Sequence, residues 1–365
     1  MLKRGYTTGT CSAIAAKAAA RMIFEKSLVY KEKITVPEGT VVECDILDPQ
    51  LKGNTASCAV KKYAGDDPDI TDGMLIYAEL TLNKGGINIE GGKGIGRVTK
   101  KGLEQEIGQA AINKVPRRMI YNAVEEIFDL YGYDKGADII ISAPEGEEKA
   151  KKTFNPRLGI EGGISILGTS GIVEPMSEKA LTDTIKVEIN VKKANEAANV
   201  LLLSPGNYGV DFLRESYGID LNRAVKYSNF LGEALDFAIE AGYKKILIAG
   251  HIGKLVKVAG GIMNTHSRNA DCRMEIIASN TALVTEDIAL VKRLMTCLTT
   301  DEAVELLREK GLCDSLMNIL VEKMAFYIKN RINDKAEAGI LTFSNVYGLL
   351  GKTENADEII KQVIL

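Results

Sequence analysis

The sequence contains no tryptophan and only two histidines, and its six cysteines are scattered without a Cys-x-x-Cys pair. Metal ligands are therefore too sparse for a structural zinc site, and the cysteine spacing gives no disulfide framework. No apolar run approaches the roughly 20 residues of a membrane-spanning helix, and the first residues do not resemble a signal peptide. We expect a cytoplasmic protein with reduced, mostly buried thiols and no metal site of its own.

An excess of charge of one sign is also missing, since 46 Lys and Arg face 49 Asp and Glu for a net charge of -3. Without an overall basic field, the chain is not expected to bind nucleic acid or an anionic membrane. What is present is an average hydrophobic fraction of 45%, typical of a folded globular protein. A chain of 365 residues exceeds one ordinary hydrophobic core and predicts two domains.

The two halves of the chain differ in their pattern of elements. In the first half, short β-type runs follow one another without helices between them, which favours antiparallel pairing, and helices are expected at 10–24 and 116–131. In the second half, strands at 200–203, 224–227, 245–249 and 340–343 alternate with helices, which predicts a parallel sheet covered on both faces. We predict an α+β domain at 1–185 and a Rossmann-like α/β domain with a mainly parallel sheet at 186–365.

The N-terminal motif GYTTGTC, residues 5–11, places Thr7, Thr8 and Thr10 at the mouth of the first helix. Backbone N–H groups at a helix N-terminus attract carboxylates and phosphates, so these threonines are candidate ligand contacts. A well-capped helix with a tight entry turn explains the same residues equally well. Cys11, which has no histidine near it in the sequence, is expected to be a small buried residue rather than a nucleophile.

A glycine-rich run at 91–97 is followed by a basic region that includes Arg97, Arg117 and Arg118. It is not a P-loop, because no Gly-Lys-Ser/Thr opens a helix. Six basic and two acidic side chains between 97 and 118 suit a small polycarboxylate or phosphate, although a solvated surface remains the alternative. The stretch 154–177 contains five glycines and predicts a loop-rich ligand wall, with Arg157, Thr169 and Ser170 as contacts, or else plain turns between domains.

Two strands of the second half end in glycine turns, at 205–209 and 250–253. An open α/β sheet binds adenosyl or dinucleotide ligands at such strand ends, and Asn229 would replace the acid that usually holds a ribose. Both histidines, His251 and His266, follow the third strand in a polar loop where a metal site is the weaker interpretation. The residues predicted to hold this ligand are Pro205, Gly206, Asn207, Gly209, Asn229, Gly250 and Gly253.

Several motifs together resemble one family, the CbiD-type cobalt-precorrin-5B C(1)-methyltransferases of anaerobic cobalamin biosynthesis. The resemblance spans most of the chain up to about residue 275, with one departure at Lys114, where the family pattern suggests proline. The matching motifs are GYTTGTC (5–11), AGDDPDIT (64–71), GGKGIGRVTKKGL (91–103), AINKVPRRMI (111–120), FNPRLGIEGGISILGTSGIVEPMS (154–177) and GHIGKLVKVAGGIMNTHSRNAD (250–271).

The resemblance implies methyl transfer from S-adenosylmethionine to ring carbon 1 of cobalt-precorrin-5B, giving cobalt-precorrin-6A. Cobalt would enter only as part of this tetrapyrrole. Domain 1–185 would bind the macrocycle and domain 186–365 the donor, with His251, His266, Asp66 and Asp67 as candidate proton acceptors. The residues expected to hold the substrate and its carboxylates are Thr7, Thr8, Thr10, Arg97, Arg117, Arg118, Arg157, Thr169, Ser170, Lys254 and Arg268.

Two other classes of protein stay open at this point. The glycine-rich run at 91–96 with a following helix would suit a small-molecule kinase, and the basic residues would equally suit a non-catalytic corrinoid carrier. Assembly into a homo-oligomer, and contacts with other corrin-pathway enzymes, are also left open.

Overall fold

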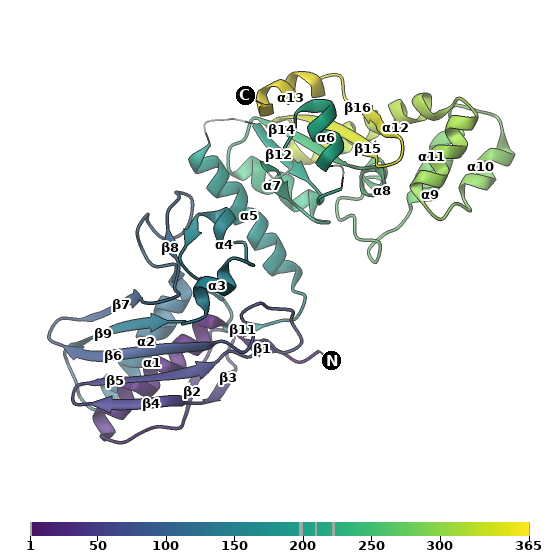
Figure 1. Ribbon diagram of the computed structural model, residues 1–365. Helices are drawn as coiled ribbons and strands as arrows, with labels where there is room; N and C mark the ends of the chain where they lie inside the picture. Colours follow the sequence, from purple (N-terminus) through teal and green to yellow (C-terminus); the bar gives the residue numbers. More distant parts are fainter. Residues whose placement is uncertain (1, 197–199, 209, 221–222, 365) are drawn as a thin grey trace. The chain divides into compact units, whose positions relative to one another are not determined.

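The computed structural model describes residues 2–196, 200–208, 210–220 and 223–364 of a mixed α/β protein (Figure 1). The chain divides into two compact units, Met1–Glu178 and Lys179–Leu365, and each has its own hydrophobic core. None of the helices within the described residues is long and apolar enough to span a membrane. All six thiols are free, five of them buried and Cys272 exposed.

The N-terminal unit is built on a five-stranded sheet. Its order is β4 (Leu47–Lys52), β5 (Thr55–Lys61), β6 (Leu75–Asn83), β9 (Gly136–Ser142), β7 (Ile87–Gly91). All neighbours are antiparallel except β7 and β9, which run parallel. The antiparallel pairing expected from strands without intervening helices is therefore confirmed for β4 with β5, for β5 with β6, and for the separate hairpin of β2 (Lys31–Thr35) and β3 (Val41–Asp45).

Two helices, α1 (Thr8–Glu25) and α2 (Lys114–Leu130), pack against each other on one face of this sheet (Figure 1). The alanines of α1 are all buried, and their small side chains allow the strands and α2 to approach closely. The helix begins two residues earlier than expected. Its N-cap is Thr7, whose hydroxyl accepts from the Thr10 N–H at 3.2 Å, so Thr10 lies inside the first turn.

The C-terminal unit is built on a second five-stranded sheet. Its order is β13 (Val225–Lys226), β12 (Val200–Ser204), β14 (Lys245–His251), β15 (Glu337–Ser344), β16 (Gly348–Lys352). The first four strands are parallel, as expected, and β16 is an antiparallel edge strand that the sequence analysis missed. After β12 the chain forms β13 on one side of it and then β14 on its other side. The strand order therefore reverses between β12 and β14.

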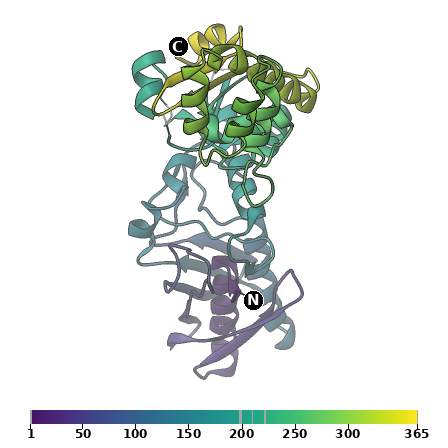
Figure 2. The same cartoon turned by 90° about the vertical axis from the view of Figure 1, so that its right-hand side faces the viewer.

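Both faces of this sheet are covered by helices (Figures 1 and 2). Alternate residues of β12, β14 and β15 belong to two different cores, as side chains of a strand point to opposite faces. Helices α7 and α12 contribute to one core, and α6 and α13 to the other. The helices are α5 (Glu178–Asn195), α6 (Val210–Tyr217), α7 (Leu231–Glu240), α8 (Ile252–Leu255), α9 (Arg273–Thr281), α10 (Ile288–Leu294), α11 (Thr300–Glu309), α12 (Cys313–Ile332) and α13 (Ala356–Ile364).

Candidate functional site

The carboxyl ends of the parallel strands in the C-terminal unit gather polar side chains at one edge. The register places Ser204, at the end of β12, beside Lys226, at the end of β13. The Ser204 hydroxyl and the Lys226 ammonium both donate to the carbonyl oxygen of Gly206, at 2.9 and 3.2 Å. On the other side of β12, His251 ends β14 beside Phe343 of β15. Side chains far apart in the sequence therefore meet where the strand order reverses.

The two glycine turns predicted to hold a ligand lie at this reversal, which is where open α/β sheets bind ligands. An ideal Cβ built on Gly206 meets nothing within 4 Å, so there is open space beside this turn. An ideal Cβ on Gly250 would come within 3.0 Å of the Pro205 ring. The two turns therefore pack together so closely that a side chain at position 250 would press against Pro205. Asn207 is exposed, and Gly209 lies outside the described residues.

His251 is half-buried, and its Nδ1 accepts a hydrogen bond from the Gly253 N–H at 3.1 Å. Burial lowers the pKa of His251 below its ordinary value, with the carboxylate of Asp301, 4.0 Å from Nε2, acting in the opposite direction. The neutral ring therefore carries its proton on Nε2, because the lone pair of Nδ1 is engaged. His251 presents a donor, not the free lone pair that a base needs.

His266 has the same arrangement in an exposed loop, because its Nδ1 accepts from the Arg268 N–H at 3.0 Å. Lys254, predicted to hold a substrate carboxylate, donates to the Ser228 carbonyl at 2.9 Å, and burial, then the charge of Lys257, lowers its pKa. The carbonyl of Asn229 accepts from the Thr265 N–H at 2.9 Å. These contacts fix the turn after β13 against the loop that carries His266.

The sequence analysis missed two polar groups at this edge, Asp301 and Ser344. The Ser344 hydroxyl, at the end of β15, donates to Asp301 Oδ1 at 2.6 Å. Asp301 lies in the first turn of α11. Ligands bind at the carboxyl ends of strands in open α/β sheets. A search for polar residues directly after each predicted parallel strand would therefore have identified Ser344.

In the N-terminal unit, the threonines of the first motif are buried and bonded to the stretch 165–171. Thr8 Oγ1 accepts from the Leu167 N–H at 3.0 Å, and Thr10 Oγ1 donates to the Gly171 carbonyl at 2.6 Å. Next to them, β1 (Gly5–Tyr6) pairs with β11 (Ile172–Val173). Of the two interpretations left open, the geometry matches the capped helix with a tight entry, because the chain's own carbonyls occupy the positions of a ligand.

Two of the predicted carboxylate-binding arginines, Arg97 and Arg117, are engaged within the fold. Arg97 bonds Glu90 at 2.8 Å and the Gly91 carbonyl at 2.7 Å. Arg117 donates to three backbone carbonyls, and burial lowers its pKa. Arg118 is exposed, and no described residue forms a hydrogen bond or ion pair with its guanidinium.

The central stretch offers fewer ligand contacts than expected. Ser170 uses its hydroxyl within its own turn, donating to the Ile172 carbonyl at 3.0 Å. Arg157, at the end of the short α4 (Asn155–Leu158), and Thr169 are exposed. The solvent-facing groups among the candidate substrate contacts of this unit are therefore Arg97, Arg118, Arg157 and Thr169.

The glycine-rich run contacts the backbone of its own unit. An ideal Cβ on Gly94 would fall far inside the Ala143 carbonyl, and one on Gly163 would fall inside Gly94 itself. The run is followed by β8 (Arg97–Val98), not by a helix, which corrects the expectation behind the kinase alternative. These glycines allow segments of backbone to cross closely.

The candidate bases Asp66 and Asp67 hold backbone segments together. Asp66 Oδ2 accepts from the Lys3 N–H at 2.7 Å, and Asp67 Oδ1 from the Met176 N–H at 2.9 Å. Each carboxylate thus binds a backbone N–H far away in the sequence, which is a structural role. Nothing in these contacts directs either aspartate to a ligand.

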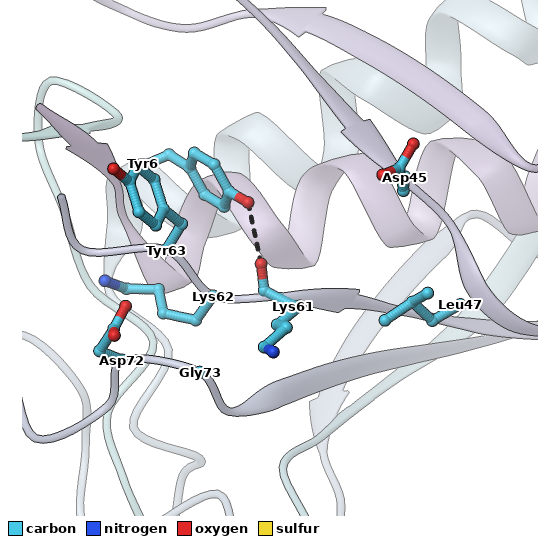
Figure 3. Close-up of a pocket in the computed structure, with 8 residues that line it drawn as sticks. All are labelled: Tyr6, Asp45, Leu47, Lys61, Lys62, Tyr63, Asp72 and Gly73. Atoms are coloured by element: carbon cyan, nitrogen blue, oxygen red, sulfur yellow. Dashed lines mark hydrogen bonds between the residues drawn. The ribbon is translucent and has the colours of Figure 1, made fainter.

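A cavity of about 560 Å³ opens in the N-terminal unit (Figure 3). The Tyr6 hydroxyl donates to the Lys61 carbonyl at 2.9 Å, and burial raises the pKa of Tyr6. The rings of Tyr6 and Tyr63 are 6.1 Å apart. None of the lining residues was predicted, although Tyr6 lies within the first motif. They are Tyr6, Asp45, Leu47, Lys61, Lys62, Tyr63, Asp72 and Gly73.

The described residues contain no group of three or more His, Cys, Asp or Glu side chains placed to hold a metal ion. The Asp301 carboxylate and the His251 ring lie close together, but among the described residues no third such side chain joins them. Among the described residues, open space beside polar groups is found at the polar edge of the C-terminal sheet and in the cavity of the N-terminal unit.

Comparison with known proteins gives matches over nearly the whole chain. The CbiD family model matches residues 1–175, and the model of the CbiD C-terminal domain matches residues 264–354. Two proteins named cobalt-precorrin-5B C(1)-methyltransferase are 49% and 44% identical to the chain. The first, from Ruminiclostridium cellulolyticum, aligns over 94% of this chain and 90% of its own length. The second, from Alkaliphilus metalliredigens, aligns over 99% and 94%.

A protein of the same name from Salmonella typhimurium is 40% identical over 99% of this chain and 95% of its own length. Among solved structures, that of the cobalamin biosynthesis protein CbiD from Archaeoglobus fulgidus is 28% identical. It covers 74% of this chain and 83% of that one, with a TM-score of 0.40. Identity of 40 to 49% over nearly the full length shows that the chain belongs to the CbiD family.

Proposed function

We propose that this chain transfers a methyl group from S-adenosylmethionine to ring carbon 1 of cobalt-precorrin-5B, giving cobalt-precorrin-6A. The observation that carries the proposal is the similarity to proteins named for this reaction, which extends over 99% of the chain for several of them. Such similarity covers both units and is not confined to one shared domain. Cobalt belongs to the substrate in this proposal, so the protein needs no metal site for it.

We further propose that the C-terminal unit is a Rossmann-like domain that binds the donor between the ends of β12 and β14. The strand order reverses there, and Gly206 leaves open space beside the turn. The lysines Lys226 and Lys254 lie near this edge and carry positive charge that suits a carboxylate. No acid follows β13, so Asn229 is the side chain at that strand end that could bond a ribose hydroxyl.

When bound, S-adenosylmethionine supplies a methyl group already activated by its sulfonium. The protein therefore needs no nucleophilic side chain, and its contribution is to hold the donor and ring carbon 1 in line and to exclude water. The thiols of Cys11, Cys44 and Cys58 agree with a reaction that needs no protein nucleophile. Burial raises the pKa of each and keeps it protonated. The N-terminal unit would bind the macrocycle, with Arg118, Arg157 and Thr169 as solvent-facing contacts.

The histidines are expected to contribute little as bases. In His251→Asn the amide oxygen can accept the Gly253 N–H in place of Nδ1, since asparagine is a favoured helix cap, and in His266→Asn it can accept the Arg268 N–H. We expect each variant to keep more than about one tenth of the single-turnover rate of methyl transfer, with both ligands saturating, from about pH 6 to about pH 9. Loss of a general base usually costs at least ~10²-fold.

The pH dependence provides the control for this experiment. Because the pKa of folded His251 is lowered, its protonation opposes folding, so stability is complete above about pH 6.5 and declines as the pH falls below that value. His251→Asn should remove this dependence from the melting temperature while leaving the pH profile of the rate unchanged. A rate that drops about 100-fold in either variant would identify a histidine base and contradict the expectation.

Calorimetric titration separates the proposed function from its two rivals. A methyltransferase binds S-adenosylhomocysteine and not ATP, a kinase shows the reverse, and a corrinoid carrier binds the macrocycle without either. Of the two nucleosides, we expect only S-adenosylhomocysteine to give heat of binding. Binding of ATP, or of neither nucleoside by a folded protein, would contradict the proposed function.

A further inference from the structure

Lys62 is a buried ammonium with too few partners. Its side chain is 1% exposed, and its Nζ donates to Asp69 Oδ2 at 3.0 Å. An ammonium has three N–H donors, and among the described residues no second acceptor bonds this one. Two donors of a buried charge are thus left without a protein partner. A buried donor left unsatisfied destabilises the fold, so such an arrangement calls for an explanation.

The other buried lysines of the chain, in contrast, have an acceptor for each of their donors. Lys257, also 1% exposed, donates to Thr265 O, Ser267 Oγ and Ala270 O at 2.9 to 3.1 Å. Lys17 donates to Lys33 O at 3.1 Å and to both carboxylate oxygens of Glu126 at 2.7 and 2.8 Å. Each has three acceptors within the fold. Lys62 differs from them in one further respect, because it lines the cavity of the N-terminal unit.

The cavity has the size and the lining of a small-molecule site. Its volume of about 560 Å³ lies within the range of about 300 to 1,000 Å³ typical of ligand pockets. Figure 3 shows the Lys62 ammonium beside Tyr63 and Asp72, with the ring of Tyr6 nearby. Tyr63 is 42% exposed and offers an aromatic surface. The Asp72 carboxylate already accepts from the Ala64 N–H at 2.8 Å.

The charges around the cavity leave Lys62 available for an anion. Burial would raise the pKa of Asp69, but the charge of Lys62 and hydrogen bonds from Thr71 outweigh it and lower the pKa, so Asp69 is ionised. Asp45, on the cavity wall, is within 3.8 Å of the ammonium of Lys31. Lys61 adds a second lysine to the lining and has an exposed side chain. Carboxylates of the wall are therefore already bonded or paired, while two of the three Lys62 donors have no acceptor among the described residues.

We propose that Lys62, with Tyr6 and Tyr63 beside it, forms a subsite for one peripheral carboxylate arm of the tetrapyrrole substrate. This inference rests on the proposed function, which supplies a macrocycle with carboxylate side chains. The two unused N–H donors of Lys62 bond the carboxylate, and the tyrosine rings contact the apolar part of the arm. Charge-assisted hydrogen bonds of this kind are about twice as strong as neutral ones.

The test uses the full-length chain and two stable corrins as probes. Cobyrinic acid has free side-chain carboxylates, whereas in its fully esterified methyl ester the same arms are neutral. We expect wild-type protein to bind the acid more tightly than the ester. In Lys62→Met, which keeps the apolar stem and removes the ammonium, affinity for the acid should fall at least about tenfold, while affinity for the ester should change little.

Two further variants make the result independent of folding. Lys62→Met leaves Asp69 unpaired, so the double variant Lys62→Met/Asp69→Asn, which neutralises the pair, should recover the melting temperature and still bind the acid weakly. Lys17→Met is the matched control, because it removes a buried lysine whose acceptors are all internal. It should lower stability and leave affinity for the acid unchanged.

Methyl transfer distinguishes failure of this inference from failure of the proposed function. If the inference holds, Lys62→Met raises KM for cobalt-precorrin-5B at least about tenfold and leaves KM for the donor unchanged. A folded variant with wild-type affinity and KM overturns the subsite while the function stands. Equal binding of acid and ester by the wild type also overturns it. Absence of methyl transfer by the wild-type chain overturns the proposed function instead.

Discussion

Replacing Gly94 by alanine is expected to lower the free energy of unfolding of the N-terminal unit by at least about 3 kcal/mol. Gly94 has a φ of +76°, a region that L-residues with a Cβ rarely adopt. An added Cβ would also overlap the carbonyl of Ala143, which is backbone of the strand-end turn and cannot rotate away. The alanine variant must therefore both strain its own backbone and move a neighbouring segment.

Gly162 provides a matched control for this change. Its φ of +78° is nearly the same, but an added Cβ meets nothing within 4 Å. Gly162→Ala should therefore cost only the backbone strain, about 1 to 2 kcal/mol. Thermal melting of the full-length variants measures the difference, and we expect Gly94→Ala to lose roughly 6 °C or more. Equal melting temperatures of the two variants would contradict the close backbone packing at Gly94.

Replacing Gly206 by valine is expected to weaken binding of S-adenosylhomocysteine at least about tenfold without lowering the melting temperature. The turn after β12 has room for a side chain, since an ideal Cβ at Gly206 meets nothing within 4 Å and the backbone is not in the left-handed region. The valine methyl groups would then fill the space that we assign to the donor. Gly206→Ala, which fills less of it, should give a smaller effect.

Gly85 is the matched control for this second prediction. It lies in the N-terminal unit, and like Gly206 it has open space around an added Cβ and no positive φ. Gly85→Val should leave both affinity and melting temperature unchanged. Isothermal titration with S-adenosylhomocysteine measures the affinities. Wild-type affinity in a folded Gly206→Val variant would remove the donor from the end of β12.

The regular elements could be predicted because they depend on local patterns. The alanine-rich run gives α1, and the alternation of strands and helices gives the parallel sheet. The antiparallel strand β16 and the last helix, α13, were missed. The short run that forms β16 has two glycines and reads locally as a turn, and its pairing with β15 depends on a neighbour placed by the whole fold.

The candidate site was harder to predict, because residue type does not reveal which partners the fold supplies. Arg117 and Thr10 have suitable chemistry for a carboxylate, yet backbone carbonyls occupy them. Lys62 was overlooked, because nothing next to it in the sequence indicates that it is buried with a single acceptor. The cavity also joins residues from positions 6 to 73, and such a combination has no signature along the chain.

Isotope transfer tests the central claim most directly. Wild-type protein is incubated under anaerobic conditions with cobalt-precorrin-5B and S-adenosylmethionine labelled with carbon-13 in its methyl group. We predict that one labelled methyl group appears at ring carbon 1 of the product by NMR, with release of an equal amount of S-adenosylhomocysteine. Unchanged macrocycle, or a label at any other ring carbon, would contradict the assignment of this chain as the C(1)-methyltransferase.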